Sequence, residues 1–433
     1  MSVGIDPIVI VGAGPTGLCL ALKLGRAGIF CRVLESEPKL THDLRAGSYH
    51  PPTIEMLASV GVGAAIHARG LKVPIWQIRD RLEGVVAQFD LSVLADQTPY
   101  PYRLHLEQHR LTALLLEEIG RSAPNVEVAF STPVAHLVQD ADGVTVTPES
   151  GEAIRASFVV GCDGARSVVR GALGLEFEGF TWPERFLVAS TSYDLATIGF
   201  AGAGYIADPE HWAAVFRVPD KGPPGLWRIA YGTDPSLPEE QILDPASIQS
   251  RLRIILEHAR PAVSEFPLAY ASTYRVHQRV ARRFWSGRVT IAGDAAHLNN
   301  PLGGFGLNGG IHDALNLGEK LIRVSREGAS HAALFDHYDR QRRPINISAV
   351  QAMSIRNKRL LAETDPAERQ ASLRELRRTA ADRDSARAFL LDSSMLNSVK
   401  QAAAVPENCR LGDPFENEDI WALGERAASQ SNP

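Results

Sequence analysis

Cysteine is scarce in this sequence, and its spacing excludes two common kinds of site. The chain has 433 residues and only four cysteines, at positions 19, 31, 162 and 409, with no CxxC pair among them. Zinc knuckles and thioredoxin-like redox centres need such closely spaced pairs. We therefore expect reduced thiols, as in a cytoplasmic protein, and no metal site.

Long apolar runs and concentrated charge are also missing. The apolar run at residues 8–11 is interrupted by Gly12, far short of a membrane span, and Asp6 stands where a signal peptide would be basic. The chain has 45 Lys and Arg against 50 Asp and Glu, with no run of five basic residues. We therefore expect no membrane segment and no nucleic-acid partner.

What the chain does have is enough apolar residues for a large core. Hydrophobic residues make up 45% of the sequence. This length and composition predict more than one domain with a packed interior.

The first informative segment is a β-α-β pattern at residues 8–35. Apolar strands are expected at residues 8–11 and 31–34, with a helix at residues 17–28 between them. The connecting turn is Gly12-Ala13-Gly14-Pro15-Thr16-Gly17. Its glycines would permit a tight turn, a close approach of pyrophosphate and close packing of helix on strand. Glu35 follows the second strand, where a carboxylate accepts hydrogen bonds from ribose and disfavours a 2′-phosphate, so FAD or NAD is indicated.

A second ligand-binding segment lies almost three hundred residues later, at residues 288–317. A short strand ends in Gly293-Asp294, whose carboxylate could bind a sugar or polyol hydroxyl. Gly303, Gly304 and Gly306 would then let backbone amides approach a ligand at the start of a helix. The two segments together indicate the two ends of one long cofactor.

Between these segments the sequence predicts mainly strands. Four short alternating runs within residues 126–160 predict an antiparallel sheet. Asp163-Gly164 follows the last run, and taken alone it is more typical of a structural turn than of a binding site. Aromatic strands at residues 176–275 predict a separate sheet domain, to which residues 75–99 could contribute. A capped helix is expected to begin after Asp365, with Leu373, Leu376 and Ala380 on one face.

With three such motifs in this order, residues 8–345 resemble the flavin-dependent aromatic hydroxylases, the single-component FAD monooxygenases typified by para-hydroxybenzoate and salicylate hydroxylases. The resemblance rests on GAGPTG with Glu35, on CDGARSVVR and on AGDAAHLNNPLGGFGLNGGIHDALNL. Segments beginning at Arg45 and Glu107 add two further matches. The family implies an α/β fold, with a Rossmann-like FAD domain of the glutathione-reductase type and a discontinuous sheet domain for the substrate.

The resemblance also implies domain boundaries and residue roles. The FAD domain would comprise residues 1–75, 100–175 and 276–345, the substrate domain residues 76–99 and 176–275, and the C-terminal helices and tail residues 346–433. Glu35 would hold the adenosine ribose and Asp294 the ribityl chain. Asp163 would serve the pyrophosphate and the incoming NAD(P)H. The other expected cofactor-binding residues are Gly12, Gly14, Pro15, Thr16, Gly17, Arg45, Gln108, Pro301, Gly304, Gly306, Leu307 and Asn308.

The implied activity is hydroxylation of a small aromatic or heteroaromatic substrate with NAD(P)H and dioxygen through a flavin C4a-hydroperoxide. No side chain is required to cleave dioxygen, because the flavin carries that chemistry. A base that deprotonates a phenol would help, and the candidates in the sheet domain are Tyr193, His211, Arg217 and Tyr231, among which the sequence does not choose. Outside the late glycine segment, where residues 304–309 read GFGLNG, no second GxGxxG is present, so the choice between NADH and NADPH stays open.

Several alternatives share parts of this pattern. A related flavoprotein could catalyse epoxidation, halogenation or double-bond reduction, since fold and cofactor do not fix the reaction. The WxWxIP segment of flavin halogenases is absent. A protein that binds flavin or ligand without turnover is a weaker alternative. A plain NAD dehydrogenase would leave the late glycine segment unexplained.

Overall fold

The computed structural model describes residues 6–41, 47–259 and 263–407 and contains both strands and helices, with the last six α-helices following one another after the last strand. The strands are β1 (Ile8–Val11), β2 (Cys31–Leu34), β3 (Ser48–Tyr49), β4 (Leu71–Val73), β5 (Ile75–Asp80), β6 (Gly84–Asp90), β7 (Arg103–His105), β8 (Val126–Ala129), β9 (Val134–Gln139), β10 (Val144–Pro148), β11 (Ile154–Ala156), β12 (Phe158–Gly161), β13 (Phe177–Thr191), β14 (Ala203–Ala207), β15 (Ala213–Val218), β16 (Leu226–Gly232), β17 (Leu268–Ala281), β18 (Trp285–Ser286), β19 (Val289–Ile291) and β20 (His297–Leu298). The α-helices are α1 (Pro15–Arg26), α2 (Pro51–Ser59), α3 (Gly63–Arg69), α4 (Gln108–Ser122), α5 (Val168–Ala172), α6 (Glu239–Ile242), α7 (Pro245–Leu256), α8 (Phe305–Glu327), α9 (His331–Ile345), α10 (Ala352–Leu361), α11 (Pro366–Ala381), α12 (Arg383–Ser393) and α13 (Leu396–Ala403).

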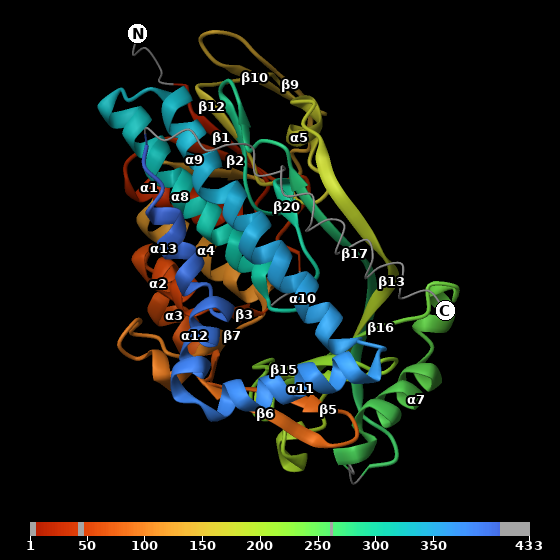
Figure 1. Ribbon diagram of the computed structural model, residues 1–433. Helices are drawn as coiled ribbons and strands as arrows, with labels where there is room; N and C mark the ends of the chain where they lie inside the picture. Colours follow the sequence, from red (N-terminus) through yellow and green to blue (C-terminus); the bar gives the residue numbers. More distant parts are fainter. Residues whose placement is uncertain (1–5, 42–46, 260–262, 408–433) are drawn as a thin grey trace.

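Two large sheets organise these elements, one in each half of the molecule (Figure 1). The upper sheet has the strand order β18-β19-β12-β1-β2-β8, and its strands are parallel except for β18. The lower sheet has the order β20-β17-β13-β16-β15-β14-β5-β6. The α/β fold class expected from the sequence is confirmed.

The predicted β-α-β unit forms as expected. All four residues of β1 are buried, and β1 pairs in parallel with β2. Helix α1 begins at Pro15, two residues before the predicted start, because the fixed φ of proline suits the first turn of a helix.

The structure of residues 126–160 differs from the wholly antiparallel sheet that the sequence predicted. Only β9, β10 and β11 pair in that way, whereas β8 and β12 are parallel strands of the upper sheet. A short alternating run does not reveal whether its partner is a neighbour in sequence or a distant strand. Here β8 pairs with β2 and β12 pairs with β1, both of which are distant in the chain.

The lower sheet is covered on both faces. Helix α7 packs on one face over a core that includes Trp227, Ile229 and Tyr231. The other face carries Trp76 and Tyr205, and the C-terminal helices pack against it. Strands β5 and β6 belong to this sheet although they precede β7 in the chain. The exact domain boundaries stay a prediction.

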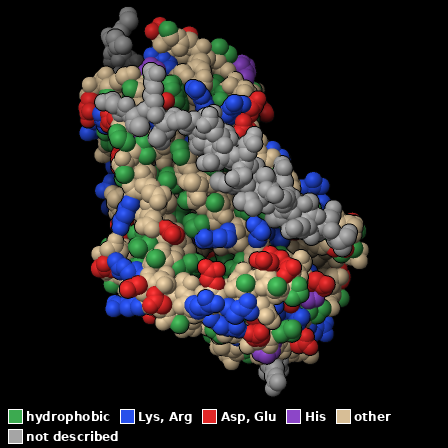
Figure 2. Space-filling model, in the orientation of Figure 1, with side chains coloured by type: hydrophobic (Ala, Val, Ile, Leu, Met, Phe, Trp, Pro, Cys, Tyr) green, Lys and Arg blue, Asp and Glu red, His purple; other side chains and the backbone are tan. Residues whose placement is uncertain are grey.

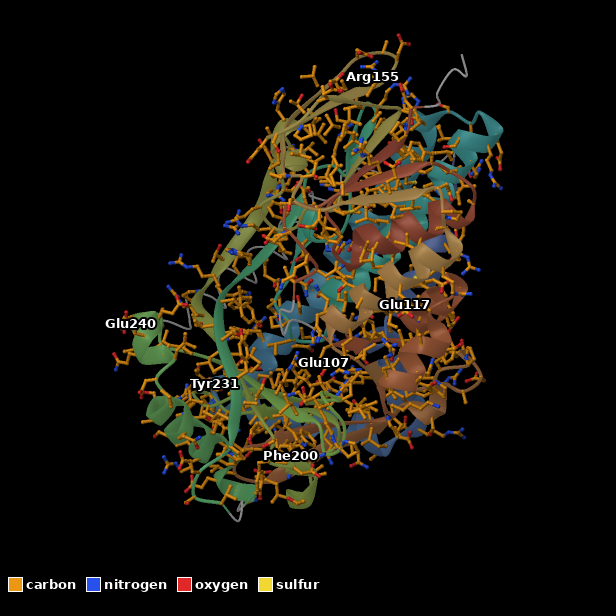
Figure 3. The ribbon with its side chains drawn as sticks, turned by 180° about the vertical axis from the view of Figure 1, so that it is seen from behind. Glu107, Glu117, Arg155, Phe200, Tyr231 and Glu240 are labelled. Carbon is orange, nitrogen blue, oxygen red and sulfur yellow. The ribbon has the colours of Figure 1, made fainter. Side chains whose placement is uncertain are left out.

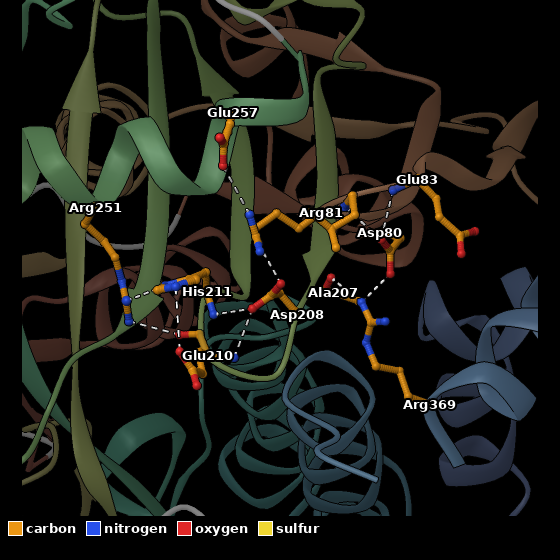
Figure 4. Close-up of polar contacts among 11 residues, drawn as sticks. Asp80, Arg81, Glu83, Ala207, Asp208, Glu210, His211, Arg251, Glu257 and Arg369 are labelled. Carbon is orange, nitrogen blue, oxygen red and sulfur yellow. Dashed lines mark hydrogen bonds and ion pairs between the residues drawn. The ribbon is translucent and has the colours of Figure 1, made fainter. Parts of the chain in front are cut away.

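The C-terminal helix α11 begins as the sequence predicts. The Asp365 side chain accepts hydrogen bonds from the backbone nitrogens of Ala367 and Glu368, and Leu373 and Leu376 are buried. Arg369 joins α11 to the lower sheet through an ion pair with Asp80 (Figure 4).

The exposed surface of α11 is charged. Lys and Arg side chains gather over this helix, with acidic groups beside them (Figure 2). In the described part of the chain, no helix has the combined length and apolar character needed to cross a membrane.

Candidate functional site

The predicted binding segments meet at one edge of the upper sheet. Strands β19, β12, β1 and β2 are parallel neighbours, so their carboxyl ends lie side by side. These ends lead into Gly293-Asp294, Asp163-Gly164, the turn at residues 12–17 and Glu35, respectively. In open α/β sheets, ligands bind outside the carboxyl ends of the strands.

The glycine turn after β1 leaves room for a ligand. Gly12 has φ +104°, and a Cβ there would lie 2.5 Å from the carbonyl oxygen of Cys162. A Cβ on Gly14, by contrast, would meet no protein atom within 4 Å. Gly12 is therefore required by the fold, whereas Gly14 borders open space where a pyrophosphate could approach the start of α1.

The early and late glycine segments are in direct contact. A Cβ on Gly293 would lie 2.7 Å from Thr16 Oγ1, and one on Gly310 would lie 2.5 Å from the same atom. The first turn of α1 therefore packs against the Gly293-Asp294 segment and α8, as one bridging ligand requires. Asp294 itself is exposed.

The two other predicted carboxylates accept backbone hydrogen bonds. Glu35 Oε2 accepts from the backbone nitrogen of Ala13 at 2.7 Å, which fixes the glycine turn beside it. Asp163 accepts from Ser167 Oγ at 2.6 Å and from the backbone nitrogen of Val169 at 3.1 Å. Burial raises the pKa of Asp163, and these hydrogen bonds oppose the rise.

The start of α8 provides backbone amides without a side-chain cap. Gly304 caps this helix in the left-handed conformation, at φ +70°, and Gly306 and Leu307 lie in its first turn. Pro301 is exposed just before it. Uncapped N–H groups at the positive end of a helix dipole can stabilise negative charge on a bound ring.

Two further predicted residues occupy different surroundings. The buried Asn308 amide binds the backbone of His50, Ser48 and Gly304, so it ties β3 and α2 to α8. Gln108 is the first residue of α4. Arg45 lies outside the described residues.

Glu107 precedes α4 and joins it to the lower sheet (Figure 3). Its Oε1 accepts from the backbone nitrogen of Asp220 at 2.8 Å, and Arg110 Nε lies 3.2 Å from Oε2. Asp220 belongs to the loop between β15 and β16. The β15–β16 hairpin of the lower sheet is thereby attached beside Gln108.

A buried triad of Asp313, His297 and Arg342 supports the late glycine segment. Asp313 Oδ2 accepts from His297 Nε2 at 2.6 Å and from the backbone nitrogen of Gly293 at 3.1 Å, and Oδ1 accepts from Arg342 Nε at 2.7 Å. Burial alone would raise the pKa of Asp313, but His297 and Arg342 lower it to about 2. Asp313 is therefore ionised and fixes the position of Gly293.

A second buried cluster lies on the lower-sheet side of the late glycine turn. Tyr205 and His50 both interact with the Gly303 backbone, and His50 Nε2 donates to the Gly303 carbonyl at 2.8 Å. Burial lowers the pKa of His50 well below its usual range, and Arg103 adds to the effect. Burial likewise lowers the pKa of His105 to about 4, although its Nδ1 donates to the Arg217 carbonyl at 2.7 Å. Both imidazoles are therefore neutral at pH 7.

Arg103 is the charged member of this cluster. It is only 6% exposed, and its Nε has no hydrogen-bond partner. Its guanidinium carbon lies 4.9 Å from the centre of the Trp76 ring. Among the described residues no carboxylate is paired with it, so the cluster holds a buried positive charge that an anionic ligand could neutralise.

This cluster was not predicted from the sequence. Three of the four candidates considered for a base, Tyr193, His211 and Tyr231, lie by α7 or in the core beneath it, and Arg217 reaches back to the hairpin carbonyl of Pro224. An available signal was Arg103-Leu104-His105, where two basic side chains alternate in a buried strand.

Comparisons with known proteins agree with this geometry. The family model described as "FAD binding domain" matches residues 6–353. Para-nitrophenol 4-monooxygenase of Pseudomonas sp. (strain WBC-3) is 38% identical over 396 residues, which cover 91% of this chain and 96% of the relative. The 6-hydroxy-3-succinoylpyridine 3-monooxygenase of Pseudomonas putida (strain DSM 28022 / S16) is 34% identical, covering 83% and 90%.

Solved structures give the same result. The crystal structure of p-nitrophenol 4-monooxygenase from Pseudomonas putida DLL-E4 superposes with a TM-score of 0.85 at 37% identity, covering 91% of this chain and 98% of that one. A ternary complex of aklavinone-11 hydroxylase with FAD and aklavinone superposes with a TM-score of 0.72 at 25% identity, covering 84% and 70%. This chain belongs to the flavin-dependent aromatic hydroxylases, and its cofactor is FAD.

Proposed function

We propose that this enzyme hydroxylates a small phenol or hydroxylated heteroaromatic ring, which it binds as the phenolate, using NAD(P)H and dioxygen. In this reaction one oxygen atom of dioxygen replaces a ring hydrogen as a hydroxyl group, and the other leaves as water. NAD(P)H supplies two electrons as hydride, and the solvent supplies one proton. Two of its relatives are named for ring substrates that carry a hydroxyl group.

The observation that carries this proposal is the buried, unpaired guanidinium of Arg103. An isolated charge in a protein interior is costly unless an opposite charge joins it. Arg103 lies with His50 and Tyr205, both of which interact with the Gly303 backbone of the turn that leads into α8. A phenolate oxygen bound to Arg103 would place its ring beside this turn.

FAD, when bound, accepts hydride from NAD(P)H and activates dioxygen, which side chains alone do not do. Glu35, Asp163 and Asp294 and the first turns of α1 and α8 would hold it. Arg103 would keep the substrate oxygen deprotonated, which raises the electron density of the ring that receives oxygen. The nearby Trp76 and Leu302 are buried and apolar, so they would exclude water.

The test is a panel of phenols, hydroxybenzoates and pyridinols added to the purified holoenzyme. We expect at least one of them to accelerate NAD(P)H oxidation, and mass spectrometry with labelled dioxygen should find one labelled oxygen in the product. Methyl ethers of the active compounds are the matched control and should stimulate poorly. Equal stimulation by ethers and phenols, or peroxide as the only product, would contradict the proposal.

A further inference from the structure

The buried guanidinium of Arg103 lies over an aromatic stack that extends to the C-terminal helices. Phe389, on α12, stacks on Trp76 with ring centres 5.7 Å apart and planes 3° apart. Tyr205 meets the same indole edge-on at 5.3 Å. Phe89 contacts both Trp76 and Phe389, at 5.8 Å and 4.6 Å. A continuous line of ring contacts therefore joins α12 to Arg103.

Arg103 depends on this stack because its surroundings offer little else to fix it: Trp76 and Tyr205, which is itself packed on Trp76, are its attractive neighbours. Its Nε has no hydrogen-bond partner, and the structure describes no ion pair for it. A guanidinium over an indole face is attracted by the ring quadrupole, most strongly where water is excluded. The orientation of Trp76 therefore decides where the guanidinium lies.

Helix α12 is held in place by contacts that do not involve Phe389. Arg387 forms two hydrogen bonds with the Asp96 carboxylate, at 2.5 and 2.6 Å, and one with the Val93 carbonyl at 2.8 Å. Leu390 is buried in the same apolar cluster. The Phe389 ring can therefore be altered while the helix stays docked.

We propose that Phe389 is a positioning residue for substrate binding: from the C-terminal helix it holds the Trp76 ring, which in turn holds Arg103 where it meets the phenolate. This inference rests on the proposed function. In this role α12 does not contact the substrate, and it influences substrate binding only through Trp76 and Arg103. Substitutions in this helix would then tune phenolate affinity.

The test compares Phe389→Leu with Leu391→Ala, which removes apolar contact from the same helix and cluster. We expect Phe389→Leu to raise the Kd and KM for the phenolate about five- to tenfold, in line with the loss of a desolvated cation–π contact, with kcat changed less. The acid limb of kcat, which reports the ionisation of the bound phenol, should move to higher pH. Phe389→Tyr should restore the wild-type Kd, KM and pH profile. Leu391→Ala should leave all three at their wild-type values.

If Phe389 had only a structural role, Phe389→Leu and Leu391→Ala would have the same small effects on Kd and KM. That result would overturn the inference. If the wild-type holoenzyme binds no phenolate, the proposed function is wrong. The positioning role of Phe389 can then still be tested by comparing the position of Arg103 in crystal structures of the two variants. Arg103 should then be displaced in Phe389→Leu and unmoved in Leu391→Ala. An unmoved Arg103 in both variants would reject the role.

Discussion

Among single residues, Arg103 is a buried cation for which the structure describes no ion pair. Replacing it with methionine keeps much of the apolar stem and removes the charge. We expect Arg103→Met to raise KM for phenolates by about thirtyfold or more, because losing one partner of a buried charged contact costs roughly 2–5 kcal/mol. Steady-state kinetics across pH should also show the acid limb of kcat shifted towards the pKa of the free phenol.

Arg79→Met is the matched control for that experiment. Arg79 is also buried and lies over an aromatic ring, that of Phe200, but it donates hydrogen bonds to Gln77 and Gly199. Its loss should lower stability and leave the KM for phenolates near the wild-type value. Similar KM values for both variants would contradict the assigned role of Arg103.

Asp339 predicts a pH dependence of stability. Burial raises its pKa to about 6, although its Oδ1 accepts from the backbone nitrogen of Phe284 at 2.7 Å. The folded state therefore holds this proton more tightly than the unfolded state, so the stabilisation is present below about pH 4 and is lost as pH rises through about 6. Asp339→Asn should remove this loss and raise the free energy of unfolding at pH 7 by up to roughly 2 kcal/mol. Urea denaturation between pH 4 and 8 checks it, and parallel curves for both proteins would contradict it.

At the scale of elements, two glycines of the turn between β1 and α1 have separable roles. Gly14→Val places a side chain in space that no protein atom occupies, at a φ of −69° that valine adopts readily. We expect the apoprotein to keep its thermal stability while the affinity for FAD falls at least tenfold, as measured by flavin fluorescence. Gly12→Ala should instead destabilise the apoprotein, because its Cβ would collide with Cys162.

The same elements show how far local patterns reach. The strands at residues 8–11 and 31–34 and the cap at Asp365 could be predicted because burial, spacing and capping are local properties. Strands β8 and β12 could not be assigned correctly, since their partners are distant in the chain. The Arg103 cluster was missed for a similar reason: it forms only when β7, β14 and the turn before α8 come together.

At the scale of the whole molecule, two strands are shared by both cores. Strand β17 contributes Val280 and Ala281 to the upper core and Val276 to the lower core, and β13 pairs with it from Phe177 to Thr191. Unfolding of β13 and β17 in one half would therefore remove buried contacts from the core of the other half.

Unfolding of the holoenzyme should therefore be a single transition. Tryptophan fluorescence, which reports mainly on the lower sheet, and flavin absorbance, which reports on the upper half, should change at the same urea concentration. Excess FAD should raise both midpoints together, because a ligand that binds only the folded state stabilises it. Two separated midpoints would show that the halves unfold independently.

The β-α-β start and the late glycine segment could be predicted from the sequence, because both depend on turn geometry and on residue types at short spacing. Their spacing alone allowed FAD or NAD, and the resemblance to a known family favoured FAD. The folded chain alone sets the strand order and places the carboxyl ends of β1, β12 and β19 at one edge of the upper sheet. It also brought Arg103, Trp76 and Phe389 into one stack from positions far apart in the chain. Such contacts depend on packing between distant segments, which no local pattern encodes.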